Sequence, residues 1–322
     1  MQSVTTSAPG KLMFFGDHAV VYNHPCIVTA VDHRMKVQLF LTDDSQLTLN
    51  APDVEIMRYQ KSIDQLGQGD MPKGAQFVEV AVRNFSAKFN TSQGVNITST
   101  SEFSSEFGFG SSSAVTVATI RALSEIFERP MTEKELFDLS YKTVLDIQKK
   151  GSGFDVAAAV YGGTLYFLTA GEIIEKLAVE NLPLIVGYTG VKADTTTLIT
   201  QVQKTADEYP IVVEGVFGLI EELVNEAKAA IGSQDFEKLG KLMNMNQGLL
   251  ETLGVSTEKL SQLNYSALNA GAYGAKLSGA GGGDCMIACS PDDQRAKVID
   301  AIVQVGGTNI EVSTNAPGVR VE

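Results

Sequence analysis

Cysteine, histidine and basic residues are scarce in this sequence, and each scarcity excludes a class of protein. The three cysteines, Cys26, Cys285 and Cys289, form no C-x-x-C pair and indicate neither a disulfide framework nor a zinc site. The three histidines show no H-x-x-x-H spacing, which argues against a metallohydrolase. Such cysteine usage is typical of a reducing compartment, so we expect a cytoplasmic protein.

Positive charge is outweighed throughout the chain. The 25 Lys and Arg residues face 38 Asp and Glu residues, which gives a net charge of −13. Because an acidic surface repels nucleic acid and anionic membranes, we expect neither as a partner. The first residues lack the basic and apolar segments of a signal peptide, and no apolar run approaches the ~18 residues of a membrane span. Hydrophobic residues still make up 44% of the chain, enough for a sizeable core.

The hydrophobic pattern predicts strands first, then helices, then strands again. Alternation predicts strands between Val4 and Thr42, interrupted at Ser7–Gly10, and another at 94–99. Helical periodicity predicts helices at 76–89, 132–148, 194–208, 211–231, 234–249 and 257–270. Strands mixed with runs of helices favour a two-layer α+β fold over a doubly wound parallel sheet. A change in composition after residue 182 predicts two domains, 1–182 and 183–322.

The stretch Ser105–Ala118 combines a glycine-rich loop with the start of a helix. Gly108 and Gly110 allow positive φ and close approach of the backbone to a ligand, and Ser111–Ser113 stand where a helix N-cap is expected. Free N–H groups, a helix dipole and the absence of side-chain bulk together favour a phosphate site. Taken alone, the stretch fits equally well a loop that only caps a core helix.

Two further glycine-rich stretches also need an explanation. Ser278–Asp284 holds four glycines within five residues, which favours close approach to a ligand or another loop over a simple hairpin. In Gly151–Val160 one carboxylate, Asp155, either faces a cleft or caps a helix. Lys11, in an early strand, points either to solvent at a sheet edge or into the same cleft. A lysine beside that aspartate would keep it charged and would stabilise a transferring phosphoryl group.

Several nucleotide-binding classes are excluded by missing motifs. The chain has no G-x-x-x-x-G-K-[ST], so it is not a P-loop NTPase. It has neither H-R-D nor D-F-G, so it is not a protein kinase. Neither glycine stretch is followed by an acidic residue in the arrangement of a dinucleotide fold, which argues against NAD.

The three glycine-rich stretches together resemble the GHMP kinases, a superfamily of small-molecule kinases. The G-L-G-S-S-A-A loop of that superfamily corresponds to Gly108–Ala114, and its K-x-S-G-A-G-G-G run corresponds to Lys276–Gly283. Ser7–Lys11 and Gly16–Tyr22 are similar to the S-A-P-G-K and G-E-H-A-V-V-Y segments of mevalonate kinases, especially those of archaeal type. The resemblance covers essentially the whole chain.

This resemblance implies a ribosomal-S5-like N-terminal domain, a ferredoxin-like C-terminal domain and a site in the cleft between them. It implies transfer of phosphate from ATP, with Mg²⁺, to the 5-hydroxyl of the small molecule (R)-mevalonate. Asp155 is the expected base, Lys11 its partner and Ser112 the expected magnesium ligand. The residues expected to bind ATP are Glu106, Gly108, Phe109, Gly110, Ser111, Ser112 and Ser113. The residues expected to line the acceptor site are Asp17, His18, Val20, Ser152, Thr189, Gly279 and Ala280.

The middle of the chain departs from the mevalonate kinase pattern. The position of the usual acid, eleven residues before Asp155, holds Val144, and the nearest acid, Asp146, is rotated by roughly 200° on a helix. Gly151–Gly162 instead resembles phosphomevalonate kinase. Lys149 and Lys150 before it would suit a substrate that already bears a phosphate, although lysines at a helix C-terminus are favoured in any case. The alternatives are therefore a phosphorylated acceptor or a catalytically silent, ligand-binding relative. Analogy with relatives also favours a homodimer.

Overall fold

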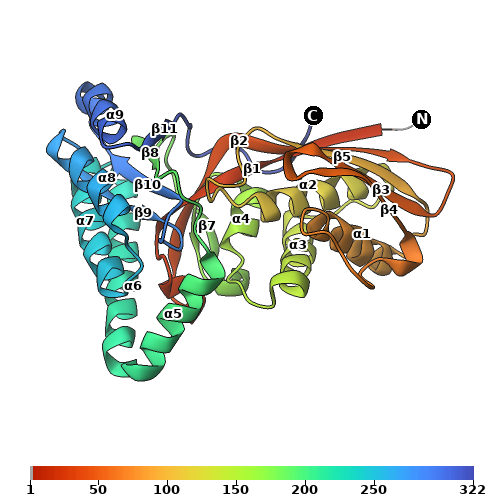
Figure 1. Cartoon of the computed structure of the whole chain (residues 1–322), viewed down its shortest axis with the longest axis horizontal. Helices are drawn as coiled ribbons and strands as arrows, with labels where there is room; N and C mark the ends of the chain where they lie inside the picture. The colour runs from red at the N-terminus through yellow and green to blue at the C-terminus, as the bar shows by residue number, and fades with distance from the viewer. Residues whose placement is uncertain (1–2) are drawn as a thin grey trace.

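The computed structural model describes residues 3–322 and arranges them around two sheets (Figure 1). The first sheet has eight strands in the central order β12-β1-β2-β5-β3-β4, with β6 paired to β2 and β7 paired to β6. These strands are β1 (Ser3–Phe15), β2 (Cys26–Leu41), β3 (Gln46–Ala51), β4 (Ile56–Ser62), β5 (Val95–Ser101), β6 (Thr164–Phe167), β7 (Ile174–Lys176) and β12 (Arg320–Val321). The β3–β5 pair is parallel, whereas β1, β2 and β6 pair in antiparallel fashion.

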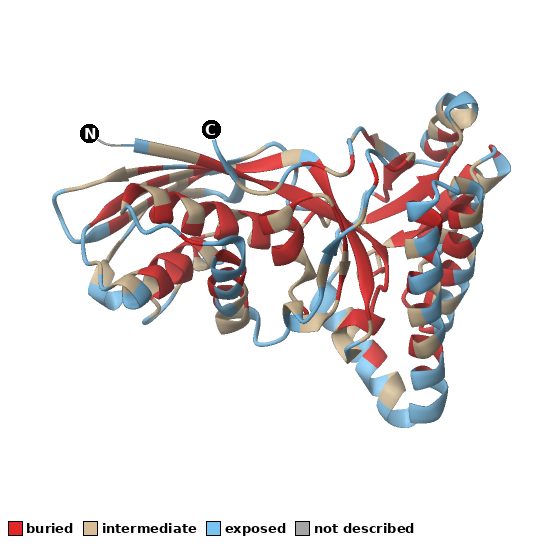
Figure 2. Cartoon of the chain, turned by 180° about the vertical axis from the view of Figure 1, so that it is seen from behind, coloured by how far each residue is buried: buried red, intermediate tan, exposed pale blue. Residues whose placement is uncertain are grey.

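Four helices gather on one face of this sheet and enclose the first core, as the buried residues in Figure 2 show. They are α1 (Gln76–Phe89), α2 (Ser111–Ile126), α3 (Glu133–Gln148) and α4 (Phe154–Tyr161). At the start of α3, Thr132 Oγ1 accepts from Glu135 N and the Glu135 carboxylate accepts from Thr132 N, which is the predicted capping box. Helices segregated to one face of a mainly antiparallel sheet confirm the predicted α+β class.

The second sheet has four strands in the order β11-β8-β10-β9, and every neighbouring pair is antiparallel. The elements of this half are β8 (Leu184–Tyr188), α5 (Thr195–Glu208), α6 (Pro210–Gly232), α7 (Phe236–Thr252), α8 (Glu258–Asn269), β9 (Gly274–Ser278), β10 (Cys285–Cys289), α9 (Arg295–Gln304) and β11 (Thr308–Ile310). A strand, helices, two strands, a helix and a last strand make the βαββαβ sequence of a ferredoxin-like domain. The four helices before β9 begin and end close to their predicted positions.

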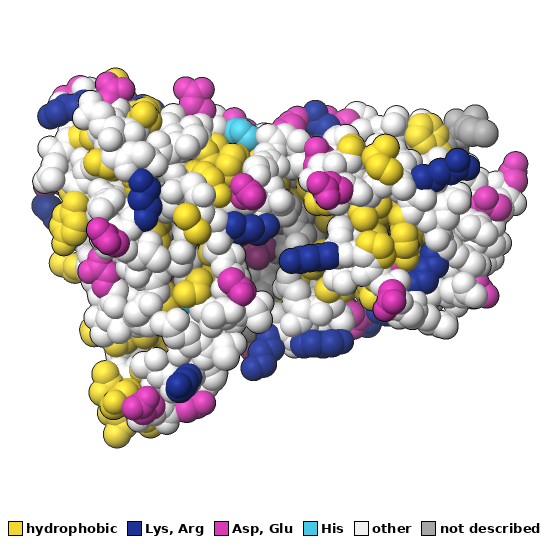
Figure 3. Space-filling model, in the orientation of Figure 1, with side chains coloured by type: hydrophobic (Ala, Val, Ile, Leu, Met, Phe, Trp, Pro, Cys, Tyr) yellow, Lys and Arg dark blue, Asp and Glu magenta, His cyan; other side chains and the backbone are white. Residues whose placement is uncertain are grey.

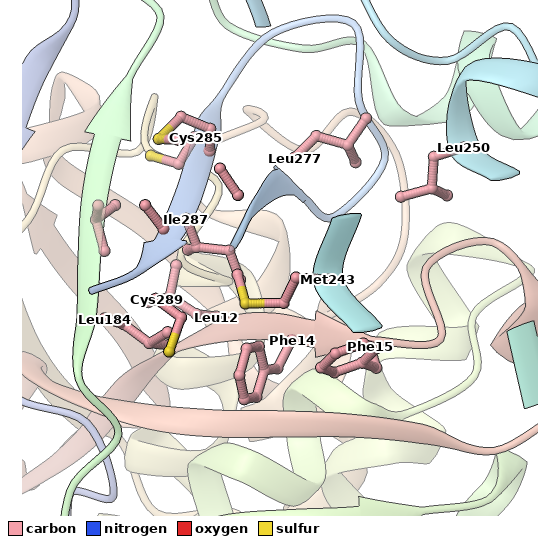
Figure 4. Packing of buried hydrophobic residues seen from close by; sticks show 14 of the residues in the cluster. Leu12, Phe14, Phe15, Leu184, Met243, Leu250, Leu277, Cys285, Ile287 and Cys289 are labelled. Atoms are coloured by element: carbon pink, nitrogen blue, oxygen red, sulfur yellow. The ribbon is translucent and has the colours of Figure 1, made fainter. Parts of the chain in front are cut away.

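The last residues of strand β1 pack into the core of the second half while still paired with β2. Its Leu12, Phe14 and Phe15 belong to the same buried cluster as Met243 of α7 and Ile287 of β10 (Figure 4). Burial of large apolar side chains contributes about 1.5–3 kcal/mol each, so this shared cluster fixes the two halves against one another. The glycine-rich hairpin that follows β9 is thereby held next to β1.

The last residues of the chain return to the first sheet. Strand β12 pairs with β1, and the Arg34 guanidinium donates to the carbonyls of Pro317 (2.9 Å) and Gly318 (2.8 Å). A division after residue 182 assigns this tail to the second domain by chain position, although it packs on the first. The domain limits 1–182 and 183–322 therefore stay a prediction.

Two local predictions are wrong. Ser7–Gly10 does not interrupt the first strand, because β1 continues through it with only a shift in its pairing to β2 between Pro9 and Gly10. A Cβ at residue 10 would lie 3.2 Å from Phe109 Cβ, so glycine is needed there for close approach rather than for a break. Strands β3 and β4 were not predicted, because their alternation is short and is broken by turn residues.

Candidate active site

The side chains of Lys11 and Asp155 meet although they are far apart in the sequence. Lys11 lies in β1 and Asp155 in the first turn of α4, and Lys11 Nζ is 3.2 Å from Asp155 Oδ1. The same ammonium group donates to the carbonyl of Gly108 at 2.9 Å. Lys11 is nearly buried, so it points into the interior and not to solvent at a sheet edge. One lysine thus joins the early strand, the glycine-rich loop and α4.

Asp155 keeps one carboxylate oxygen available. Its Oδ1 is buried and accepts no hydrogen bond, because the contact with Lys11 Nζ is an ion pair without hydrogen-bond alignment. The interpretation of Asp155 as a helix cap is wrong, since the N-cap of α4 is Gly153 (φ 95°). A buried acceptor without a donor is costly unless a ligand satisfies it. This oxygen faces Lys11, so the exposed part of the carboxylate, whose side chain is 35% exposed, is the part that an acceptor hydroxyl can reach.

The glycine-rich loop leads into α2 with a different cap from the predicted one. Gly110, with φ 76°, is the N-cap, and Ser111–Ser113 form the first helical turn without capping it. The N–H groups of a first turn have no partner within the helix, and the helix dipole makes this end positive. A Cβ at residue 110 would lie 3.1 Å from Lys11 Cε, so the loop backbone lies directly against the lysine. These free donors beside an ammonium group can hold a phosphate.

The side chain of Phe109 packs beneath the glycine-rich loop. It is buried, its ring lies near the rings of Phe103 and Phe107, and its carbonyl accepts from Lys11 N at 3.0 Å. Because its side chain is buried, Phe109 can contact a nucleotide only through its backbone. Glu106, in contrast, is exposed at the start of the loop.

The second glycine-rich stretch is the hairpin between β9 and β10, where Ser278 pairs with Cys285. The sequence favours close approach over a hairpin, and the structure shows both. A Cβ at Gly281 would lie 2.1 Å from Val255 O and one at Gly283 would lie 2.5 Å from Val191 O, so other backbones press on the loop. Gly279 has open space on its Cβ side, which leaves it free to face a ligand.

Asp17 and His18 meet this hairpin and not an open pocket. Asp17 Oδ2 accepts from Lys276 Nζ and Oδ1 accepts from Gly279 N, both at 2.7 Å. Both carboxylate oxygens are thus bonded within the protein, and a contact of Asp17 with an acceptor stays a prediction. His18 Nε2 lies 2.8 Å from Ala280 O, and burial lowers the pKa of His18 while this hydrogen bond raises it less. The imidazole is therefore neutral near pH 7, with its Nε2 proton donated to that carbonyl.

The other residues expected at the acceptor site are buried around it. Val20, Ser152 and Thr189 each expose less than a twentieth of their surface, and the Thr189 hydroxyl donates to Val191 O at 3.1 Å. Contact of these residues with an acceptor stays a prediction. In the space-filling view, the surface is hollowed between the two halves, with charged side chains of both signs at the edges (Figure 3).

The region that departs from the expected pattern offers no substitute acid. Val144 is buried, and the Asp146 carboxylate accepts from Arg83, Asn84 and Lys142 at 2.6–3.0 Å. Burial raises the pKa of Asp146, but these hydrogen bonds and the positive charges that make them lower it by more. The pKa of Asp146 is therefore below its ordinary value. Within residues 3–322, no group of three or more His, Cys, Asp or Glu side chains is placed to hold a metal. Mg²⁺ does not need such a cage, because it uses one or two protein ligands together with substrate phosphates and water.

Two residues of the site were not assigned from the sequence. Lys276 lies in the quoted glycine motif, but its full burial beneath Asp17 depends on the packing of two distant strands. Asp284 directly follows the glycine run, and this place in the sequence was the signal that could have identified it. In the structure its carboxylate lies against Gly108.

Among the described residues, no helix has both the length and the apolar character required to cross a membrane.

Comparison with known proteins gives consistent matches. The family model described as "GHMP kinases N terminal domain" matches residues 76–163, and "GHMP kinases C terminal" matches residues 219–307. A mevalonate kinase of Pyrococcus abyssi is 38% identical over 330 residues, covering 99% of this chain and 98% of that protein. Among solved structures, Lin0012 of Listeria innocua has a TM-score of 0.89 at 25% identity, covering 100% of this chain and 99% of that one. Mevalonate kinase of Methanococcus jannaschii has a TM-score of 0.84 at 24% identity, with coverage of 97% and 98%.

Proposed function

The chain belongs to the GHMP kinase family, and on this premise we propose that it transfers the γ-phosphoryl group of ATP to the 5-hydroxyl of (R)-mevalonate. The observation that carries the proposal is the meeting of Lys11 and Asp155 at the start of α2, 3.2 Å apart. The acceptor follows from relatives named mevalonate kinase, which are 36–38% identical over 99% of the chain. The products are 5-phosphomevalonate, an intermediate of isoprenoid biosynthesis, and ADP.

The glycine-rich loop and the first turn of α2 fit the polyphosphate of ATP. The N–H groups of Ser111–Ser113 are free donors at the positive end of a helix. The side chain of Ser112 makes no cap within that turn, and its hydroxyl is the group we assign to Mg²⁺. When bound, Mg²⁺ neutralises part of the phosphate charge. Phosphoryl transfer depends mainly on such positioning and charge neutralisation.

Asp155 and Lys11 act at the reacting atoms. The Asp155 carboxylate, held by Lys11 through its Oδ1, accepts the proton of the acceptor hydroxyl as the hydroxyl oxygen bonds to phosphorus. The bond from phosphorus to the leaving oxygen breaks, and ADP carries away that electron pair. Lys11 Nζ, fixed by the Gly108 carbonyl, stabilises the negative charge on the transferring group.

The acceptor site that we propose is built around the junction of β1 with the β9–β10 hairpin. Gly279 and Ala280 supply backbone groups there, and His18 is held against Ala280. A neutral His18 does not bring positive charge to a carboxylate, so it contacts a neutral group of the acceptor. Val20, Ser152 and Thr189 form the surrounding wall.

A coupled assay of ADP release tests the acceptor. The purified chain should turn over with mevalonate and show little activity with phosphomevalonate, homoserine or galactose. Activity with phosphomevalonate alone would support the alternative acceptor, and no transfer to any of the four would support a silent relative. The intact Lys11–Asp155 pair favours catalysis over the silent alternative.

The position of Lys149 does not favour binding of a second phosphate group. Its Nζ donates to the carbonyl of Asp146 at 2.7 Å, so the lysine caps the end of α3. Lys150 is exposed beyond that end. A cytoplasmic location and a homodimer belong to the same proposal, and size-exclusion chromatography with light scattering measures the second.

A further inference from the structure

Asp284, at the end of the β9–β10 hairpin, is held firmly although it lies in a loop. Its N–H donates to Val191 O at 2.7 Å and its carbonyl accepts from Thr189 N at 2.9 Å. Its Oδ1 accepts from Ala193 N at 2.8 Å. The backbone takes a positive φ of 52°, which few residues other than glycine, asparagine and aspartate adopt. These bonds prevent the carboxylate from turning away from its neighbours.

The second carboxylate oxygen of Asp284 lies against the glycine-rich loop. A Cβ at Gly108 would lie 2.6 Å from Asp284 Oδ2, so no other residue fits at position 108 without displacing the carboxylate. Gly108 is the residue whose carbonyl accepts from Lys11 Nζ. A fixed negative charge therefore borders the loop that we assign to the polyphosphate of ATP.

The neighbouring lysines do not fully neutralise the negative charge of the Asp284 carboxylate. Lys11 and Lys192 are the cations that act on Asp284, but Lys11 is already paired with Asp155. Burial raises the pKa of Asp284, while the Ala193 N–H and both lysines oppose the rise. The whole chain also carries a net charge of −13. A polyphosphate entering alone would meet unbalanced negative charge.

We propose that Asp284 makes nucleotide binding conditional on a divalent cation, because its carboxylate repels a polyphosphate that arrives without one. This inference rests on the proposed nucleotide site at the glycine-rich loop. A divalent cation such as Mg²⁺ that is bound to the phosphate oxygens reduces their negative charge, so it weakens the repulsion. The carboxylate thus favours binding of the metal–nucleotide complex over binding of the free nucleotide. The free nucleotide is not the form used in phosphoryl transfer.

Isothermal titration calorimetry of ADP, with excess Mg²⁺ and with EDTA, tests this without turnover. Asp284→Asn removes the charge, keeps an oxygen for the Ala193 N–H and tolerates the positive φ. We expect this variant to bind metal-free ADP about tenfold more tightly than the wild type and to bind the magnesium complex within about threefold. Asp194→Asn is the matched control, since it removes one charge nearby and keeps the N-cap acceptor for Thr197 N. It should retain the wild-type ratio of the two dissociation constants.

Three results would overturn the inference. An unchanged ratio in Asp284→Asn would show that the carboxylate does not discriminate, and an equal change in Asp194→Asn would assign the effect to general charge. Asp284→Gly, which removes the carboxylate without strain at φ 52°, must change the ratio in the same direction as Asp284→Asn. If the wild type binds ADP with Mg²⁺ but the Asp284 variants do not change the ratio of the two dissociation constants, only this inference fails. If the wild type binds no ADP at all, the proposed function fails with it.

Discussion

Lys276 Nζ lies 2.7 Å from Asp17 Oδ2, and neither side chain exposes any surface to solvent. The lysine belongs to β9 in the second half of the molecule, and the aspartate follows β1 in the first half. Asp17 Oδ1 also accepts from Gly279 N, so the pair fixes the start of the glycine-rich hairpin to the end of β1. Burial lowers the pKa of Lys276, and the Asp17 carboxylate beside it opposes that effect.

Removal of one partner of this pair should be strongly destabilising. Lys276→Met keeps the apolar stem but leaves the Asp17 charge buried, so we expect the free energy of unfolding to fall by about 3–5 kcal/mol. Urea denaturation followed by circular dichroism measures it. Lys241→Met, which breaks an exposed pair with Glu237, should leave the free energy of unfolding nearly unchanged, because solvent screens that pair. Equal losses in the two variants would contradict the role of the buried pair.

Asp155→Asn should separate catalysis from nucleotide binding. The amide retains the shape of the side chain but cannot accept the hydroxyl proton as a carboxylate does, so we expect kcat to fall about 100- to 10,000-fold. The dissociation constant of ADP with Mg²⁺ should change less than about threefold. Asp146→Asn is the matched control, because that carboxylate is bonded to Arg83 and Lys142 away from Asp155. Near-normal turnover in Asp155→Asn would refute the assignment of the base.

Gly110→Ala should weaken nucleotide binding through the backbone alone. Residue 110 has φ 76°, and an added Cβ would lie 3.1 Å from Lys11 Cε, so the loop and the lysine must both shift. We expect the dissociation constant of ADP with Mg²⁺ to rise about tenfold. Gly218→Ala provides the control, since that glycine lies in α6 with open space around it and alanine favours a helix by up to about 1 kcal/mol. A Gly110→Ala variant with unchanged affinity would show that the loop does not hold the nucleotide.

The sequence predicts best the features that depend on local patterns. The capping box at Thr132 and the helices of the second half follow from residues close together in the chain, and they are found where expected. The cap of α2 was missed because glycine at Gly110 and the serines after it are both good caps, and only the backbone angle distinguishes them. The ion pair of Asp17 with Lys276 joins residues 259 positions apart, and no local signal reports such a contact.

The buried, neutral state of His18 predicts how stability should depend on pH. Burial lowers the pKa of His18 below its ordinary value of 6.5, with Ala280 O and Asp17 acting against this and Lys276 adding to it. In the unfolded chain the imidazole regains its ordinary pKa. As the pH falls from 6.5 towards the folded-state pKa, the unfolded chain therefore takes up a proton that the folded chain does not. The free energy of unfolding should then decrease, by at most about 1.4 kcal/mol per pH unit from this group.

His18→Gln isolates that contribution, because its amide can donate to Ala280 O and does not titrate. Urea denaturation at pH 8.0 gives the cost of the substitution while the imidazole is neutral in both states. Repeating the measurement between pH 7 and pH 5 should show the wild type losing stability faster than the variant. The other titrating groups are common to both proteins and cancel in the difference. Parallel curves for the two proteins would mean that His18 has the same proton affinity in the folded and the unfolded chain, and its assignment as a buried neutral donor would be wrong.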